Sequence, residues 1–145
     1  MTDPKGPIDF VPADHSRLGG GDIVISLTPA QSQALGAQAV DLAHWFHTAL
    51  QTMAMLRTGL NSAGEPYIAG PHDWHTAISD LDHQLLPRLE GVRDAAIRSH
   101  TEGGGSVGNL ATAMHVARST AQHRRDVLRR SAPSTWETWA TDGNQ

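Results

Sequence analysis

The 145-residue chain has no cysteine, a single lysine and few aromatic residues. The absence of cysteine excludes disulfide bonds, zinc fingers and thiol catalysis. No run of about 18 apolar residues is present, so no transmembrane helix is predicted. The acidic start of the chain does not have the charged-then-apolar pattern of a signal sequence. We therefore expect a soluble, cytoplasmic protein with one modest core.

Positive charge is scarce overall, since the formal net charge is −4, but it is distributed unevenly. Residues 1–87 contain three Lys/Arg and nine Asp/Glu, a balance of −6. Residues 88–130 contain eight Arg and four acidic residues, a balance of +4, and residues 131–145 add −2. An acidic partner is therefore expected to meet residues 88–130 and not the rest of the chain.

Residues 106–128 have the pattern of two helices joined by a tight turn. Over residues 107–114, apolar residues recur with the spacing of one helix face: Leu110, Ala111 and Met114. The pattern stops at His115, which we expect to adopt a left-handed conformation that His tolerates better than most residues. Val116 is expected to fill the corner, and the small Ala111 to let the next helix approach closely.

The second of these helices is expected to begin at Arg118 and to bury Ala121, Val127 and Leu128. Its other face carries hydrogen-bond donors and acceptors suited to base edges and phosphates. The candidate DNA-binding residues are Arg118, Ser119, Thr120, Gln122, His123, Arg125 and Arg129.

The segment LATAMHVARSTAQHRR, residues 110–125, resembles the bacterial trihelical helix-turn-helix, with residues 88–102 as the first of three helices. The resemblance implies a DNA-binding unit at about residues 88–130 whose last helix enters the major groove. Three residues depart from the usual pattern. His115 stands in place of Gly, Ala117 in place of a Ser or Thr N-cap, and Arg124 in place of a buried aliphatic residue.

Residues 1–27 are expected to form a mostly irregular arm with one short strand. Alternating apolar residues predict this strand at residues 22–27. Its partner is either residues 8–11, in a hairpin, or the same strand of a second subunit, because a two-stranded ribbon is marginally stable without further packing. A disordered arm with an apolar patch is the alternative.

Residues 28–87 are expected to form a helical dimerisation region. Thr28 and the proline after it begin a helix that should continue to about Leu60. One apolar stripe at helical spacing follows it: Leu35, Ala39, Leu42, Phe46, Ala49, Leu50, Met53, Leu56 and Leu60. A helix of roughly 45 Å is longer than one small trihelical unit can cover. Part of it is therefore expected to pack against a second subunit.

Residues 61–71 are rich in turn formers and predict a loop. A second helix is expected to begin near Asp73 and to pass Pro87 with a kink or a brief break. Its apolar residues share one stripe, which predicts their burial: Trp74, Ala77, Ile78, Leu81, Leu85, Leu89, Val92, Ala95 and Ala96. The two long helices are expected to pack antiparallel.

The glycine-rich stretch from Gly103 to Gly108 formally matches G-x-G-x-x-G, the dinucleotide-binding fingerprint. That fingerprint requires a preceding strand, whereas a helix is predicted here, so we reject it. We expect the glycines to end one helix and Ser106 to cap the next. In residues 131–145, a capping box at Ser134 and Glu137 predicts a last short helix before the tail. Its two tryptophans are expected to pack between helices.

Nine histidines are many for this length, and imidazole with carboxylate suits zinc, iron or nickel. The candidate ligands on the two long helices are Asp41, His44, His47, His72, Asp73, His75 and His83. However, His44 and His83 lie opposite the apolar stripes, whereas metal sites of helical bundles are built in the core. We therefore expect no metal and no cofactor. No catalytic triad, phosphate loop or buried carboxylate pair stands out, so no enzymatic activity is expected.

The predicted fold is a mainly α helical bundle with a long N-terminal helix, a short N-terminal β-strand or hairpin, and a C-terminal trihelical helix-turn-helix. The predicted function is that of a small bacterial transcriptional regulator, which binds double-stranded DNA sequence-specifically as a homodimer. One alternative is a helical assembly or adaptor protein, with an ordinary helical hairpin whose basic face binds an acidic protein partner. A more distant one is a His-rich metal-binding helical protein.

Overall fold

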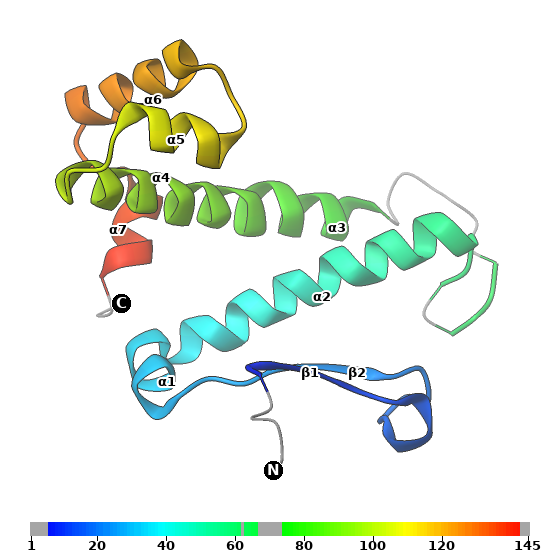
Figure 1. Ribbon diagram of the computed structural model, residues 1–145. Coiled ribbons are helices and arrows are strands. Elements are labelled where there is room, and N and C mark those ends of the chain that lie inside the picture. The colour runs from blue at the N-terminus through cyan, green and yellow to red at the C-terminus, as the bar shows by residue number, and fades with distance from the viewer. Residues whose placement is uncertain (1–5, 62, 67–73, 143–145) are drawn as a thin grey trace. The chain divides into compact units, whose positions relative to one another are not determined.

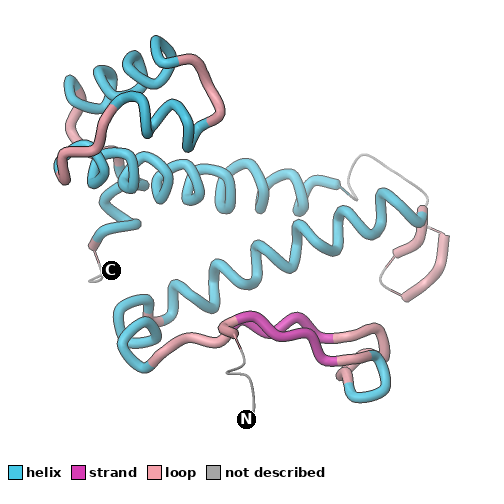
Figure 2. The backbone as a smooth tube through the Cα atoms, in the orientation of Figure 1, coloured by secondary structure: helices cyan, strands magenta, loops and turns pink. Residues whose placement is uncertain are grey.

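The computed structural model describes residues 6–61, 63–66 and 74–142. These residues are mainly helical, with one small antiparallel sheet of two strands (Figures 1 and 2). Two compact units make up the chain, Met1–Ala39 and Val40–Gln145. In the described parts of the chain, no helix has the length and apolar character needed to cross a membrane.

The sheet of the first unit is a hairpin. Strand β1 (Ile8–Val11) pairs antiparallel with β2 (Asp22–Ile25), and a turn of 3-10 helix, η1 (Ala13–His15), lies between them. The predicted strand thus pairs within the chain, which is the first of the two partners expected for it. Because directly opposed residues share a face, four apolar side chains that are 61–68% exposed lie together: Ile8, Phe10, Ile23 and Ile25.

The long helix predicted from Thr28 is interrupted. A capping box between Thr28 and Gln31 begins α1 (Pro29–Leu35), as expected. Gly36 then has φ 54° and ψ −140°, which ends α1 before α2 (Ala37–Thr58) begins. The prediction of one continuous helix was wrong because glycine adopts a positive φ at little cost, and here it does so between two helix-forming stretches.

Helix α2 leaves its predicted apolar stripe largely uncovered. Phe46, Leu50, Met53 and Leu56 are 42%, 49%, 43% and 64% exposed, and no residue of α2 is buried. Its contacts within the second unit come from the neighbouring face. Thr48 donates a hydrogen bond to the carboxylate of Asp80 (3.2 Å), and Trp45 stacks on a guanidinium of the next helical run.

The second long helix is a run of three segments, α3 (His75–Ser79), the π-helical η3 (Asp80–Leu85) and α4 (Leu86–Glu102), which follow one another along one rod (Figure 1). The expected interruption at Pro87 is therefore a π-helical segment just before it, whose wider turn accommodates the proline ring and its missing N–H. The predicted start at Asp73 lies outside the described residues.

Fewer residues are buried along this run than its apolar stripe predicted. Leu85 is 4% exposed, but Ile78 is 58%, Leu89 38% and Val92 47% exposed. These three side chains have too few neighbours in the described part of the chain to cover them. In the preceding loop, Asn61 accepts hydrogen bonds from two amides of residues 63–66; residues 67–71 of the predicted loop lie outside the described residues.

The C-terminal half of α4 lies between two layers of the second unit. Helices α5 (Val107–Met114) and α6 (Arg118–Arg130) pack on one side of it, and α7 (Thr135–Thr141) packs on the other (Figure 1). Gly91 brings α4 and α7 into close contact, since a Cβ at Gly91 would come within 2.5 Å of the Trp136 backbone. The predicted capping box of α7, between Ser134 and Glu137, is present.

Three tryptophan rings surround one arginine at the start of α4. The guanidinium carbon of Arg88 lies 4.3 Å from the ring centre of Trp45, 4.4 Å from that of Trp136 and 5.3 Å from that of Trp139. Burial lowers the pKa of Arg88, against a smaller opposing effect of the nearby Asp41 carboxylate. The cation therefore joins α2, α4 and α7, and the tryptophans of α7 pack between helices as predicted.

Candidate nucleic-acid interface

The candidate interface begins at the turn between α4 and α5. Gly104 has φ 84°, a left-handed conformation that favours glycine. The amides of Gly104 and Gly105 donate to carbonyls of the last turn of α4 at 3.1 and 2.8 Å, the Schellman pattern of a helix end. Ser106 then caps α5, because its Oγ accepts from the amide of Asn109 at 3.1 Å. The glycines therefore end one helix and Ser106 begins the next, as predicted.

The turn between α5 and α6 is three residues long. His115 has φ 55° and ψ 42°, the left-handed conformation expected for it. The amide of Val116 donates to the carbonyl of Ala111 at 3.1 Å, which folds the turn back on α5. Ala117 is extended and precedes α6 without any side-chain cap. This short turn fixes the direction in which α6 leaves α5.

A small core holds α4, α5 and α6 together. Its buried members are Ile97, Leu110, Ala111, Ala121 and Leu128, with Val107, Met114 and Val116 packed against them. Ala121 is fully buried, so α6 approaches α5 closely. Val127 is 45% exposed, and its predicted burial was wrong. At 100° per residue, the buried arc of α6 centres on Ala121 and Leu128, and the residue before Leu128 lies outside it.

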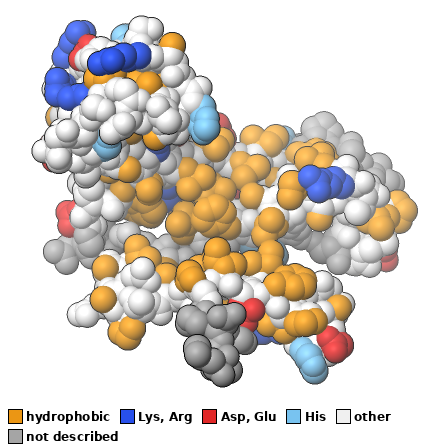
Figure 3. Space-filling view, in the orientation of Figure 1, with side chains coloured by type: hydrophobic (Ala, Val, Ile, Leu, Met, Phe, Trp, Pro, Cys, Tyr) orange, Lys and Arg blue, Asp and Glu red, His pale blue; other side chains and the backbone are white. Residues whose placement is uncertain are grey.

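Most of the candidate DNA-binding residues face away from this core. Arg118, Ser119, Thr120, His123 and Arg129 are exposed, whereas Gln122 and Arg125 are half-buried. Helix α6 carries five arginines and one aspartate. Figure 3 shows Lys and Arg side chains gathered over this helix. Because the helix presents these donors on an open surface, it can reach an anionic polymer without rearranging its core.

Two of the candidate residues already hold partners within the protein. Gln122 donates from Nε2 to Oδ1 of Asp126 at 2.8 Å, and Arg125 donates from Nη1 to the carbonyl of Gly105 at 3.3 Å. Asp126 also places a negative charge on the basic helix. To contact a nucleic acid, Gln122 and Arg125 would therefore each have to use a remaining donor or exchange this hydrogen bond.

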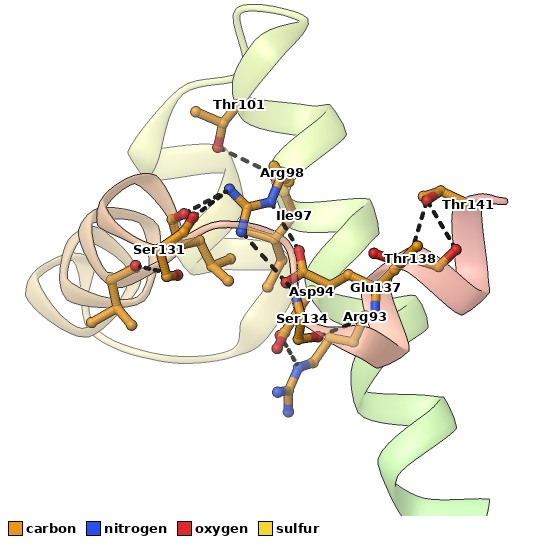
Figure 4. A network of polar contacts seen from close by, with 12 residues as sticks. Arg93, Asp94, Ile97, Arg98, Thr101, Ser131, Ser134, Glu137, Thr138 and Thr141 are labelled. Carbon is orange, nitrogen blue, oxygen red and sulfur yellow. Dashed lines mark hydrogen bonds and ion pairs between the residues drawn. The ribbon is translucent and has the colours of Figure 1, made fainter.

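An ion pair that the sequence did not predict supports the C-terminal end of α6. Arg98 of α4 donates from Nε and Nη2 to the two carboxylate oxygens of Glu137 at 2.9 and 3.4 Å (Figure 4). Its Nη1 donates to the carbonyl of Leu128 at 2.6 Å. The hydrogen bond from Arg98 lowers the pKa of Glu137, against the opposing effect of burial. The same bond raises the pKa of Arg98.

The candidate metal ligands remain apart from one another where the structure describes them. In residues 6–61, 63–66 and 74–142, no three His, Asp or Glu side chains gather into a group that could hold a metal ion. The exposed candidates are Asp41, His44, His47, His75 and His83. His72 and Asp73 lie outside the described residues. At the candidate interface, the described histidines are therefore not part of such a group.

Comparisons of the chain with protein-family models, curated proteins and solved structures find no match.

Proposed function

We propose that the protein binds duplex DNA sequence-specifically, with α6 in the major groove. The observation that carries the proposal is the pairing of a rigidly turned α5–α6 hairpin with an exposed arginine-bearing face on α6. A helix that enters the major groove reads bases with its first residues and contacts the backbone further along. Arg118, at the start of α6, then reads a base edge, and Arg129, near its end, contacts phosphate.

The proposal extends to a small bacterial transcriptional regulator that acts as a homodimer. A dimer would present two copies of α6, and its target would be a pseudo-palindrome whose half-sites are separated by one helical turn of DNA or a multiple of it. The uncovered apolar stripe on α2 supports this arrangement, since the second copy would cover it.

The experiment is binding of the full-length protein to a pool of random duplexes, followed by selection and sequencing of the bound fragments. We expect an enriched motif, and an affinity whose logarithm falls linearly with the logarithm of salt concentration as counterions are released. Binding without an enriched motif would indicate non-specific DNA binding and would reject sequence specificity. Failure to bind any duplex at low salt would reject the proposal.

The second candidate function is an adaptor that binds an acidic protein partner through the same helix. Val127 favours it, because this apolar side chain is 45% exposed beside the arginines of α6, and mixed apolar and arginine surfaces are typical of protein interfaces. Val127→Ser distinguishes the two. An adaptor should lose affinity for its partner, whereas duplex binding that depends on phosphate contacts should change little.

A further inference from the structure

A cleft of about 320 Å³ opens between α4 and α6. Its lining residues are Arg98, Thr101, Glu102, Arg125, Leu128 and Arg129. Three of these six are arginines, and Glu102 is the one acid among them. The volume lies at the small end of the range for ligand pockets, roughly 300 to 1,000 Å³. The cleft is thus large enough for a small oxyanion and carries net positive charge.

The three arginines of the cleft differ in what they already bind. The charge of Arg98 is neutralised by Glu137, and its guanidinium donates a hydrogen bond to the Leu128 carbonyl. Its side chain is therefore held in place along one side of the cleft. Arg125 is anchored only by Nη1, and its buried Nε has no hydrogen-bond acceptor in the described chain. Arg129 is exposed and makes no ion pair with the described residues. Arg125 and Arg129 therefore keep donors for a ligand.

We propose that this cleft is a phosphate site, with the phosphate oxygens accepting from the guanidinium groups of Arg125 and Arg129, which both line it. A planar guanidinium matches phosphate oxygens better than a point charge does. The negative charge of Glu102, which also lines the cleft, repels an anion and lowers the affinity of the site for phosphate. The phosphate belongs either to a small phosphorylated molecule or to the backbone of a bound duplex; the second source rests on the proposed function.

The test is a titration of the full-length protein with inorganic phosphate at constant ionic strength, followed by NMR of the Arg125 Nε–H signal. We expect a saturable shift of that signal. Arg129→Ala should weaken binding about tenfold, equivalent to roughly 1.4 kcal/mol. Glu102→Gln should tighten it about threefold. Arg130→Ala is the matched control, because Arg130 is an exposed neighbour that does not line the cleft, and it should leave the affinity unchanged.

Equal weakening by Arg129→Ala and Arg130→Ala would overturn the proposal, since it would indicate general attraction of anions to a basic helix. The absence of a saturable Arg125 shift would overturn it too. The amide spectrum of each variant reports whether it remains folded, and Arg129 is exposed, so its replacement should not unfold the chain.

A second titration, with a short duplex present, separates the two sources of phosphate. If inorganic phosphate displaces the duplex and Glu102→Gln strengthens both, the site takes a backbone phosphate. If phosphate and duplex bind together, the site takes a small phosphorylated molecule. If no duplex binds at all, the proposed function is rejected. The phosphate titration then still tests whether the cleft is a phosphate site.

Discussion

Glu137 shows at the scale of one residue how the second unit holds its helices. It is 3% exposed, and no other charged or polar side chain in the described chain is as fully buried. Its carboxylate accepts from Arg98 and from the amide of Ser134 at 2.8 Å. Removing one partner of a buried ion pair leaves the other without compensation. The pair therefore makes the stability of this unit sensitive to a single substitution.

Glu137→Gln should lower the free energy of unfolding by roughly 3 kcal/mol at neutral pH. The pKa of Glu137 is lowered from its ordinary value of 4.5, so the ionised carboxylate stabilises the folded state above that value. This contribution is lost as the pH falls through the lower, folded-state pKa. Urea unfolding across this pH range should show the difference between wild type and variant shrinking below about pH 4.5.

Glu90→Gln is the control for that measurement, because Glu90 is an exposed acid on α4, the helix that carries Arg98. It should change the unfolding free energy little at any pH. A difference between wild type and Glu137→Gln that stays constant down to strongly acidic pH would contradict the role of the charge.

Replacing Arg118 or Arg129 by alanine should impair DNA binding in different ways. On the preferred duplex, Arg118→Ala should cost about 1 to 3 kcal/mol and relax the preference at one base pair, most simply a guanine read by two hydrogen bonds. Arg129→Ala should weaken all duplexes alike and reduce the salt slope by about one unit. Affinities on specific and scrambled duplexes across a salt series measure both effects. An unchanged preference in Arg118→Ala would reject the placement of α6.

At the scale of an element, the contact between α4 and α7 reverses the usual effect of replacing a helical glycine by alanine. Gly→Ala in a helix usually stabilises a protein by about 0.5 to 1 kcal/mol. A methyl group at Gly91 would meet the Trp136 backbone at 2.5 Å, so Gly91→Ala should destabilise by roughly 1 to 3 kcal/mol. Gly108→Ala is the matched control, because the nearest atom to its Cβ, Ser106 Oγ, lies at 3.9 Å.

Urea unfolding of both glycine variants gives the comparison. Both lose the same unfolded-state freedom, so their difference isolates the contact with α7. If Gly91→Ala were as stable as Gly108→Ala, α7 would not be docked on α4 in solution.

The N-terminus of α6 is left without a cap, and this offers a stabilising change. Ala117 has the extended backbone of an N-cap, φ −63° and ψ 150°, but no side-chain acceptor. Ala117→Ser should raise the free energy of unfolding by about 1 kcal/mol, because serine Oγ accepts from a first-turn amide. Ala113→Ser, at an exposed position in the last turn of α5, should instead lower it slightly. A loss of stability in Ala117→Ser would contradict the observed start of α6.

Elements whose signals are local could be predicted from the sequence. Ser106 and the capping box of Ser134 and Glu137 act within four residues, and each begins the helix expected of it. The left-handed His115 follows from the apolar pattern stopping at a short turn. The placement of candidate residues on one helix needs only the helical period.

Features that depend on distant partners could not be predicted. Arg98 and Glu137 are far apart in the sequence, so no spacing rule pairs them, and the same holds for Arg88 and Trp45. Gly36 lies inside a sustained apolar stripe, which concealed the break between α1 and α2. The exposure of Val92 follows from which helices fail to pack against α4, a property of the whole unit.

At the scale of the whole molecule, the apolar stripe of α2 predicts a dimer. Phe46 is 42% exposed and Leu50 49% exposed, and covering such side chains contributes up to roughly 1.5 to 3 kcal/mol each. Phe46→Asp should therefore weaken dimerisation at least about tenfold without unfolding the chain, since the residue is not buried within it. Sedimentation velocity over a range of concentrations measures the change.

Leu18→Asp is the control for dimerisation, because Leu18 is 97% exposed and lies far from the stripe in the sequence. It should leave the sedimentation of the wild type unchanged. A well-folded wild-type monomer at high concentration would contradict the dimer.

The rings around Arg88 also give the protein an optical reporter. Three of its four tryptophans meet at one cation, within 5.3 Å of it, and the fourth, Trp74, precedes α3. Intrinsic fluorescence therefore reports the docking of α2 and α7 on α4 without any label. Helix α6 contains no tryptophan, so a ligand that contacts only this helix should leave the emission spectrum nearly unchanged. Tryptophan emission can thus distinguish ligand binding at α6 from unfolding of the second unit within one experiment.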